Sequence, residues 1–211
     1  ERLHENGQLQ TRRTYRDGKR DGLRETFYEN GQLEWRENYI DGVQDGLFEY
    51  FHDNGQLKER GNFIDGVQDG LYEVFYEKTG QLWLRSNWID GKQDGLEELF
   101  HVNGQLWIRG NYKDGEQDGP WEGFYEDGRL SERQNFIDGK RDGLWEGFHQ
   151  NGRLERRENY IDGKKDGLEE MFHGDDQYER TNYKDGKKHG LQEWFHENGQ
   201  LEWRENYIDG V

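Results

Sequence analysis

Residues 41–66 read DGVQDGLFEYFHDNGQLKERGNFIDG, and close copies of this unit recur along the whole chain. The Asp-Gly pair that opens the unit stands at residues 17, 41, 65, 90, 114, 138, 162, 185 and 209. The period is therefore 24 residues, with one insertion near Thr79 and one deletion after Asp176. About eight and a half copies fill the chain without a linker, so we expect residues 1–211 to form a single repeat array. The array starts and stops inside a repeat and lacks an initiator Met, so we interpret it as truncated within a repeat at both ends.

The composition is unusual for an ordinary globule. Hydrophobic residues make up 29% of the chain and charged residues 36%, a balance that is typical of disorder. Aromatic residues, however, reach 15%, and there is one proline, whereas disordered chains are poor in aromatics and rich in proline. We expect an ordered protein whose apolar contacts come from large rings and which has no thick two-layer core.

Glycine interrupts the unit every four to nine residues, a spacing that breaks helices of ordinary length. The intervening stretches, such as LFEYFH at 47–52 and LKERGNFI at 57–64, have the length and the composition of strands. Asn54-Gly55 between them is a strong hairpin signal, because both residues accept positive φ. We expect the six residues DGVQDG to form a wide turn into the next hairpin. The predicted fold is all-β: an elongated single-layer antiparallel sheet of about eight tandem 24-residue β-hairpin repeats.

The runs DGKKHG (185–190), DGKRDG (138–143), YENGQL (28–33) and FHENGQL (195–201) resemble MORN repeats, particularly their bacterial second variant. The resemblance covers essentially the whole chain. It implies a binding scaffold, and many bacterial proteins of this type are classed as antitoxins, whereas others are associated with the cell envelope. The copy at 173–183 departs from the pattern, because Asp176 replaces the turn glycine, so we expect a local irregularity there.

Two strand registers are open. A three-residue loop, Asp53-Asn54-Gly55, would place Phe51 opposite Leu57 and would bring four recurring apolar columns to one face. A two-residue loop would place Glu49 opposite Arg60 and form a ladder of ion pairs. Burying a Leu or Phe contributes ~1.5–3 kcal/mol, and an exposed ion pair contributes ~0–1 kcal/mol. We therefore expect the three-residue loop, with the four columns that begin at Leu23, Phe27, Leu33 and Tyr39 on one face.

Catalytic, metal and cofactor sites are each disfavoured by the repetition, because a catalytic constellation would break the pattern at one place. Asp41 and Asp45 could contact calcium, but two carboxylates are too few for a calcium loop, and His189 replaces the second Asp in one copy. His52 belongs to a column in which His and Tyr alternate, which indicates a half-buried flat side chain rather than a zinc ligand. Without cysteine there are no disulfides or thiolate sites. We predict a protein that is not an enzyme and that has no cofactor.

Tryptophan is the residue that departs from the repeat. In the expected register Trp83, Trp107, Trp121 and Trp145 lie on the face away from the leucine and phenylalanine columns. Exposed aromatic residues on a rigid sheet make good anchors, so these four are the partner-binding candidates. The alternative is that both faces of a single-layer sheet need rings to cover the backbone.

The formal net charge of −17 should repel nucleic acid and anionic membranes and attract a basic protein surface. The leading hypothesis is a cytoplasmic antitoxin or immunity protein that blocks a basic toxin. The alternative is a structural or adhesive repeat protein of the cell envelope or surface, if a signal precedes Glu1. Free sheet edges would allow end-to-end or edge self-association.

Overall fold

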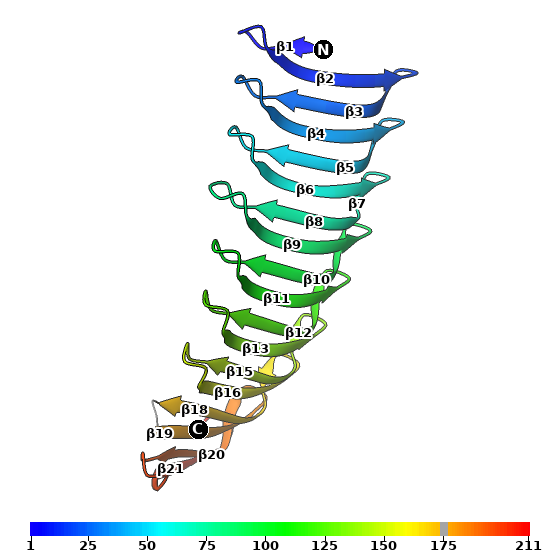
Figure 1. Ribbon diagram of the computed structural model, residues 1–211. Coiled ribbons are helices and arrows are strands. Elements are labelled where there is room, and N and C mark those ends of the chain that lie inside the picture. The colour runs from blue at the N-terminus through cyan, green and yellow to red at the C-terminus, as the bar shows by residue number, and fades with distance from the viewer. Residues whose placement is uncertain (174–176) are drawn as a thin grey trace. The chain divides into compact units, whose positions relative to one another are not determined.

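The computed structural model describes residues 1–173 and 177–211, and the chain divides into two units, residues 1–105 and 106–211 (Figure 1). In the described residues both units consist of strands and turns and contain no helix. This result confirms the predicted all-β class. The irregularity predicted at Asp176 lies outside the described residues, and the expectation of one array over residues 1–211 stays a prediction.

Each repeat contributes two strands, and the strand that follows the Asp-Gly turn is interrupted in some repeats. The strands of the first unit are β1 (Arg2–Leu3), β2 (Leu9–Arg16), β3 (Lys19–Phe27), β4 (Leu33–Ile40), β5 (Val43–Phe51), β6 (Leu57–Ile64), β7 (Val67–Gln68), β8 (Gly70–Phe75), β9 (Leu82–Ile89) and β10 (Lys92–Phe100). Those of the second unit are β11 (Leu106–Lys113), β12 (Glu116–Phe124), β13 (Leu130–Ile137), β14 (Lys140–Arg141), β15 (Gly143–Phe148), β16 (Leu154–Ile161), β17 (Lys164–Lys165), β18 (Gly167–His173), β19 (Gln177–Lys184), β20 (Lys187–Phe195) and β21 (Leu201–Tyr207).

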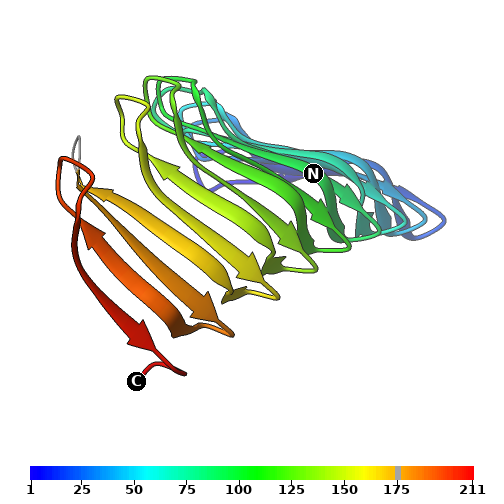
Figure 2. The ribbon, with the colours of Figure 1, turned by 90° about the horizontal axis from the view of Figure 1, so that it is seen from below.

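Within each unit every long strand pairs antiparallel with the strands before and after it in the sequence, as in β4–β5–β6. The strands lie side by side in one layer (Figure 2). The tandem-hairpin, single-layer sheet predicted from the glycine spacing is therefore confirmed. Among the described residues few large apolar side chains are buried, namely Phe48, Phe136, Tyr160 and Phe195, as expected for a sheet without a second layer.

The first Asp-Gly pair of each unit forms a tight turn by itself. Asp41 and Gly42 have φ values of 50° and 94°, and Ile40 pairs directly with Val43. Two positive-φ residues in a two-residue loop are typical of a type I′ turn, whose twist matches that of the flanking strands.

The second Asp-Gly pair does not belong to the turn, so the predicted six-residue wide turn is wrong. Asp45 and Gly46 lie within β5, where Gly46 has a φ of 101°. At this point Glu37 pairs with Phe48 but Tyr39 pairs with Gln44, so β5 carries a bulge opposite β4. A bulge accommodates the extra residues and bends the strand, and a glycine accepts the positive φ that the bend requires.

The opposite end of the hairpin has the predicted three-residue loop at residues 53–55, whereas the insertion near Thr79 gives a four-residue loop between Tyr76 and Gln81. The backbone N–H of Gly55 donates to the carbonyl of His52 at 2.9 Å, and Phe51 pairs with Leu57. Gly55 has a φ of 83°, but Asn54 is not among the positive-φ residues, so the expectation that both residues adopt positive φ is wrong. Instead, the Asn54 side chain accepts a hydrogen bond from the N–H of Gln56 at 2.9 Å, which closes the turn.

The two strand registers that the sequence left open, one with Phe51 opposite Leu57 and one with Glu49 opposite Arg60, occur together in the same hairpin. Phe51 pairs with Leu57 and Glu49 pairs with Arg60, because Lys58 is an extra residue that forms a second bulge. The bulge puts the phenylalanine and leucine beside the turn on the same face as the glutamate and arginine. We call this the ladder face, defined by Glu49, Phe51, Leu57, Arg60 and their equivalents.

The expectation that four apolar columns share one face is therefore wrong. The bulge shifts the column of Phe63 to the opposite face, which we call the aromatic face, defined by Phe48, Tyr50, Glu59, Phe63 and their equivalents. Phe48 contacts Phe63 with ring centroids 5.1 Å apart. The column of Leu47 remains on the ladder face but is exposed, with Leu47 itself at 45%.

Candidate binding surface

The ladder face repeats the same contacts in copy after copy. Each glutamate lies between two arginines of neighbouring strands. Glu73, for example, is 2.5 Å from the Arg60 guanidinium and 2.9 Å from that of Arg85, and its side chain is only 3% exposed. Equivalent pairs join Arg109 to Glu122 at 2.6 Å and Arg180 to Glu193 at 3.3 Å. The glutamate and arginine columns are constant along the chain because each of these side chains binds its strand to a neighbouring strand.

The column in which Tyr and His alternate also holds repeats together. The hydroxyl of Tyr28 donates to the carbonyl of Phe51 in the next repeat at 2.7 Å, and Tyr76 bonds Phe100 in the same way at 2.8 Å. The Nε2 atom of His4 lies 2.7 Å from the carbonyl of Phe27. Sequence reasoning expected a half-buried flat side chain and missed this bond. The signal was the interchange itself, because tyrosine and histidine are both flat rings that carry a hydrogen-bond donor.

The second Asp of the unit caps the next turn. The Asp45 carboxylate accepts from the backbone N–H of Asp65 at 3.1 Å, and Asp142 accepts from Asp162 at 3.2 Å. Where His189 replaces this Asp, its Nδ1 atom lies 3.4 Å from the Asp209 carboxylate. The duplicated Asp-Gly thus serves two adjacent turns. Over residues 1–173 and 177–211 no three histidine or acidic side chains gather as a metal site would require.

The aromatic face differs from repeat to repeat. The column of Tyr50 is occupied by Thr26, Tyr50, Val74, Leu99, Gly123, Gly147, Met171 and Trp194. The column of Glu37 is occupied by Glu37, Gly61, Ser86, Gly110, Gln134, Glu158, Thr181 and Glu205. The ladder face and the turns repeat the same contacts, whereas the contacts across the aromatic face, such as that of Tyr50 with Glu37, differ from one repeat to the next. The aromatic face is therefore the surface that gives each repeat its own chemistry.

Large rings on the aromatic face cover glycines of the neighbouring strand. Phe48 pairs with Gly61 and Trp121 pairs with Gly110. A Cβ atom at Gly110 would lie 2.1 Å from the Trp121 ring, so the ring occupies the space that a side chain would take. Trp121 also meets Tyr112 and Phe136, with ring centroids 5.7 and 5.8 Å away.

The four tryptophans predicted as anchors fall into two kinds. Trp121 and Trp145 lie half-buried on the aromatic face, and the indole N–H of Trp145 is 3.2 Å from the Glu132 carboxylate. Trp83 and Trp107 are more exposed, at 37% and 42%. Trp83 is the extra residue of its bulge, since Phe75 pairs with Leu82 and Val74 with Leu84. Trp107 holds the same place in its own repeat.

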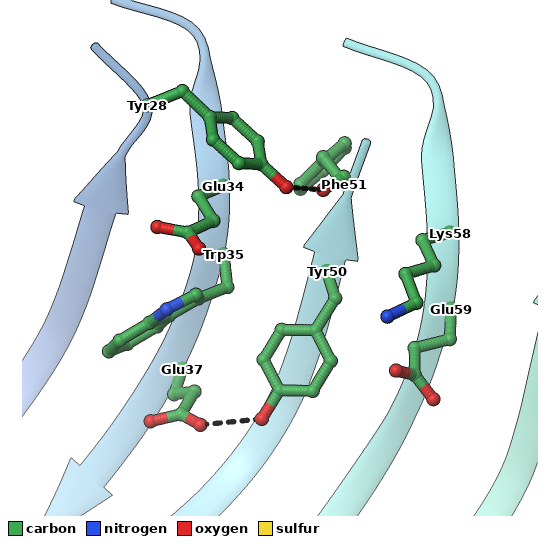
Figure 3. Close-up of a pocket in the computed structure, with 8 residues that line it drawn as sticks. All are labelled: Tyr28, Glu34, Trp35, Glu37, Tyr50, Phe51, Lys58 and Glu59. Atoms are coloured by element: carbon green, nitrogen blue, oxygen red, sulfur yellow. Dashed lines mark hydrogen bonds between the residues drawn. The ribbon is translucent and has the colours of Figure 1, made fainter. Parts of the chain in front are cut away.

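The first unit has a groove on its aromatic face, with a volume of about 430 Å³ (Figure 3). It is lined by Trp35, Glu37, Tyr50 and Glu59 of the aromatic face, by the bulge residues Glu34 and Lys58, and by Tyr28 and Phe51 beside the turns. The residues come from β4, β5 and β6 and from the turn before β4. Sequence reasoning did not find this groove, because it depends on which columns share a face.

Tyr50 stands in the middle of the groove. Its ring meets that of Trp35 edge-on at 6.5 Å, and its hydroxyl donates to Glu37 at 2.9 Å. Burial, together with the bond to the Glu37 carboxylate, raises the pKa of Tyr50 well above its usual value, so the hydroxyl stays protonated. Glu59, on the other side of Tyr50, accepts a hydrogen bond from the Tyr72 hydroxyl.

The second unit places a charged cluster on its aromatic face instead. Glu169 is bound by Lys165 at 2.6 Å and by Arg156, and Lys165 also lies 2.9 Å from Glu158. Burial by itself would raise the pKa of Glu169, but the bonds from Lys165 and Arg156 outweigh burial and lower it to about 2. The Glu169 carboxylate is therefore charged at every physiological pH.

The geometry defines a class of protein: a tandem β-hairpin scaffold with one constant and one variable face. Six segments match the family model described as a MORN repeat variant, at residues 20–41, 44–65, 93–114, 117–138, 141–162 and 188–209, which together make up more than half of the chain. The chain therefore belongs to the MORN repeat family, as its turn motifs predicted.

A search of curated proteins finds no sequence similar to this chain. In the described residues no helix is long and apolar enough to cross a membrane.

Proposed function

We propose that the protein is a non-enzymatic scaffold that binds a basic protein partner on its aromatic face, in the manner of an antitoxin or immunity protein that blocks a toxin. The observation that carries the proposal is the contrast between the two faces. Constant residues form the ladder, whereas two columns of the aromatic face vary along the chain, and this face bears most of the large rings. Aromatic residues on a preformed surface are the side chains that dominate protein interfaces.

The charge of the chain favours a basic partner. A net charge of −17 raises the rate at which a positively charged protein meets the sheet. A toxin that acts on nucleic acid carries a basic cleft, and covering that cleft would block it. We place this encounter in the cytoplasm, where such a toxin meets its substrate.

A scaffold role is further supported by how the repeated acidic residues are used. The glutamates of the ladder pair with arginine, as Glu146 does with Arg133, and the second Asp of the unit caps a backbone N–H. These carboxylates hold the sheet together and so have a structural use that explains their repetition.

The test is capture of the partner from the native organism, its identification by mass spectrometry, and rescue of the growth arrest that this partner causes. Two variants remove aromatic surface: Trp83→Ala with Trp107→Ala, and Trp121→Phe with Trp145→Phe, which keeps a ring at each buried position. Both should weaken binding of the purified partner at least about tenfold, as expected for anchor residues.

The matched control is Leu71→Ala with Leu144→Ala. These leucines lie on the ladder face and are 45% and 46% exposed, comparable to the exposed tryptophans. The control should bind as the wild type does. Equal weakening by the control would place the partner on the ladder face, and a captured partner without toxicity would overturn the antitoxin role.

A further inference from the structure

The groove between β4 and β6 is lined by aromatic rings and carboxylates. Elsewhere in the chain, a similar pair of a ring and a carboxylate is occupied by an arginine of the chain itself. The guanidinium of Arg24 lies 4.1 Å from the centroid of the Trp35 ring and 3.8 Å from the Glu37 carboxylate. On the ladder face Arg60 lies over Phe75 while it is paired with Glu73. A guanidinium that stacks on a ring and meets a carboxylate is thus a recurrent contact of this protein.

The Tyr50 and Glu59 side of the groove has the ring and the carboxylate but not the cation. Tyr50 and Glu59 are cross-strand partners on the same face. No arginine or lysine in the described residues lies within ion-pair distance of Glu59, whose bond is to the Tyr72 hydroxyl. The other side of the groove, at Trp35 and Glu37, already holds Arg24.

The charge of the lining favours a cationic occupant. Of the three carboxylates in the lining, Glu37 is paired with Arg24, and those of Glu34 and Glu59 face one ammonium, that of Lys58 (Figure 3). Half-buried walls weaken the screening of these charges by solvent. A volume of about 430 Å³ admits one long side chain.

We propose that this groove binds an arginine side chain of the protein partner, with the guanidinium against the Tyr50 ring and its N–H groups on the Glu59 carboxylate. This inference rests on the proposed function for the source of the arginine. Arginine fits better than lysine, because its planar guanidinium can stack on the ring and bind both carboxylate oxygens at once.

The experiment titrates the ¹⁵N-labelled full chain with the peptide acetyl-Gly-Arg-Gly-amide and follows the Trp35 indole N–H and the amides of β5 by NMR. Saturable shifts confined to these signals are expected. The same peptide with citrulline has nearly the same shape without the charge, and it should cause shifts at least tenfold weaker at equal concentration. Equal shifts with the citrulline peptide would overturn the proposal. Stronger shifts with a third peptide, in which lysine replaces arginine, would show that the groove binds an ammonium group instead.

Variants locate the site. Glu59→Gln and Glu34→Gln should each weaken arginine binding several-fold, whereas Lys58→Gln should tighten it by removing a like charge. Glu34→Gln keeps the test decisive if Glu59→Gln impairs folding, because among the described residues the Glu34 side chain makes no hydrogen bond or ion pair. The matched control is Glu29→Gln, an equal change of charge at an exposed position outside the groove. If Glu29→Gln weakens binding as much as Glu59→Gln, the shifts report general attraction to an acidic protein and the groove is not a site.

The peptide titration needs no native partner, so its failure leaves the scaffold proposal standing. Conversely, arginine could bind the groove even if the captured partner proves not to be a toxin.

Discussion

At the scale of single residues, glycine has two distinct uses in this chain. In the turns, glycines such as Gly42 adopt positive φ, which other residues adopt at a cost. Within strands, Gly61 and Gly110 have ordinary φ and instead leave room for a ring from the next strand. The second use resembles the covering of strand glycines by cross-strand aromatics in other sheets.

The pair Gly110 and Trp121 makes a testable case. Gly110→Ala would put a Cβ atom 2.1 Å from the indole ring, so the ring must move. We expect a loss of about 1–3 kcal/mol in the free energy of unfolding, the usual cost of overpacking. Urea denaturation of the full chain measures the change.

Gly123→Ala is the matched control, because Gly123 lies in a strand of the same unit and the atoms nearest to its added Cβ belong to the flexible side chains of Ser131 and Glu132, at 3.0 Å or more. In a Trp121→Ala background the cost of Gly110→Ala should fall towards that of the control. An unchanged cost in that background would show that the ring is not the obstacle.

The ionisation of Glu169 should make the free energy of unfolding depend on pH in the acid range. Its pKa is lowered from 4.5 to about 2 by Lys165 and Arg156, against the opposing effect of burial. A lowered folded-state pKa stabilises the fold above the unfolded value, and this contribution is lost as the pH falls from about 4.5 to 2. The contribution is therefore fully present at neutral pH.

Glu169→Gln should therefore flatten the stability profile between pH 4.5 and 2, measured by denaturant unfolding at several pH values. Glu197→Gln, an exposed change of the same charge, should leave the profile as in the wild type. Identical profiles for wild type and Glu169→Gln would contradict the assignment.

At the scale of the element, one extra residue per hairpin decides which side chains share a face. Lys58 allows Phe51 to meet Leu57 and Glu49 to meet Arg60 in the same hairpin. Without it, either the apolar pair or the ion pair would be lost, because a shift of one residue moves every side chain of a strand to the other face.

Neighbouring hairpins are joined by a side chain as well as by backbone bonds. Tyr76→Phe removes the hydroxyl that donates to the Phe100 carbonyl at 2.8 Å, and it should lower the free energy of unfolding by about 1 kcal/mol. Tyr76→His should recover most of this loss, since His4 reaches the equivalent carbonyl of Phe27. Thermal and urea unfolding of the three proteins test the ranking. A phenylalanine variant as stable as the wild type would show that this bond contributes nothing.

At the scale of the whole molecule, the constant columns give the repeats their common architecture and the variable columns give them their differences. The constant columns bind each strand to its neighbours, as expected for repeat proteins in which each unit contacts only adjacent ones. The columns of Tyr50 and Glu37 vary, although single residues in them also join neighbouring repeats, as the Tyr50 hydroxyl does by donating to Glu37 at 2.9 Å. A protein built in this way can change its partner without changing its fold.

The net charge predicts how the partner arrives. The association rate constant for a basic partner should fall about tenfold or more between low salt and 0.5 M salt, because screening removes the steering. Stopped-flow fluorescence of the tryptophans measures this rate. A rate independent of salt would contradict the expectation of a basic partner.

The sequence by itself determined the class of fold and the period, and it marked the hairpin ends without showing that only the first Asp-Gly pair of the unit forms the turn. Glycine spacing and turn residues act locally, so Asp41-Gly42 and Asn54-Gly55 favour turns independently of the rest of the chain. Only the tertiary structure decided the faces. Whether Phe63 lies with Phe51 or with Phe48 depends on a single extra residue, Lys58, and a bulge leaves no sign in the pattern of apolar residues. The groove at Tyr50 follows from that outcome, because side chains from three strands form it only once their register is set.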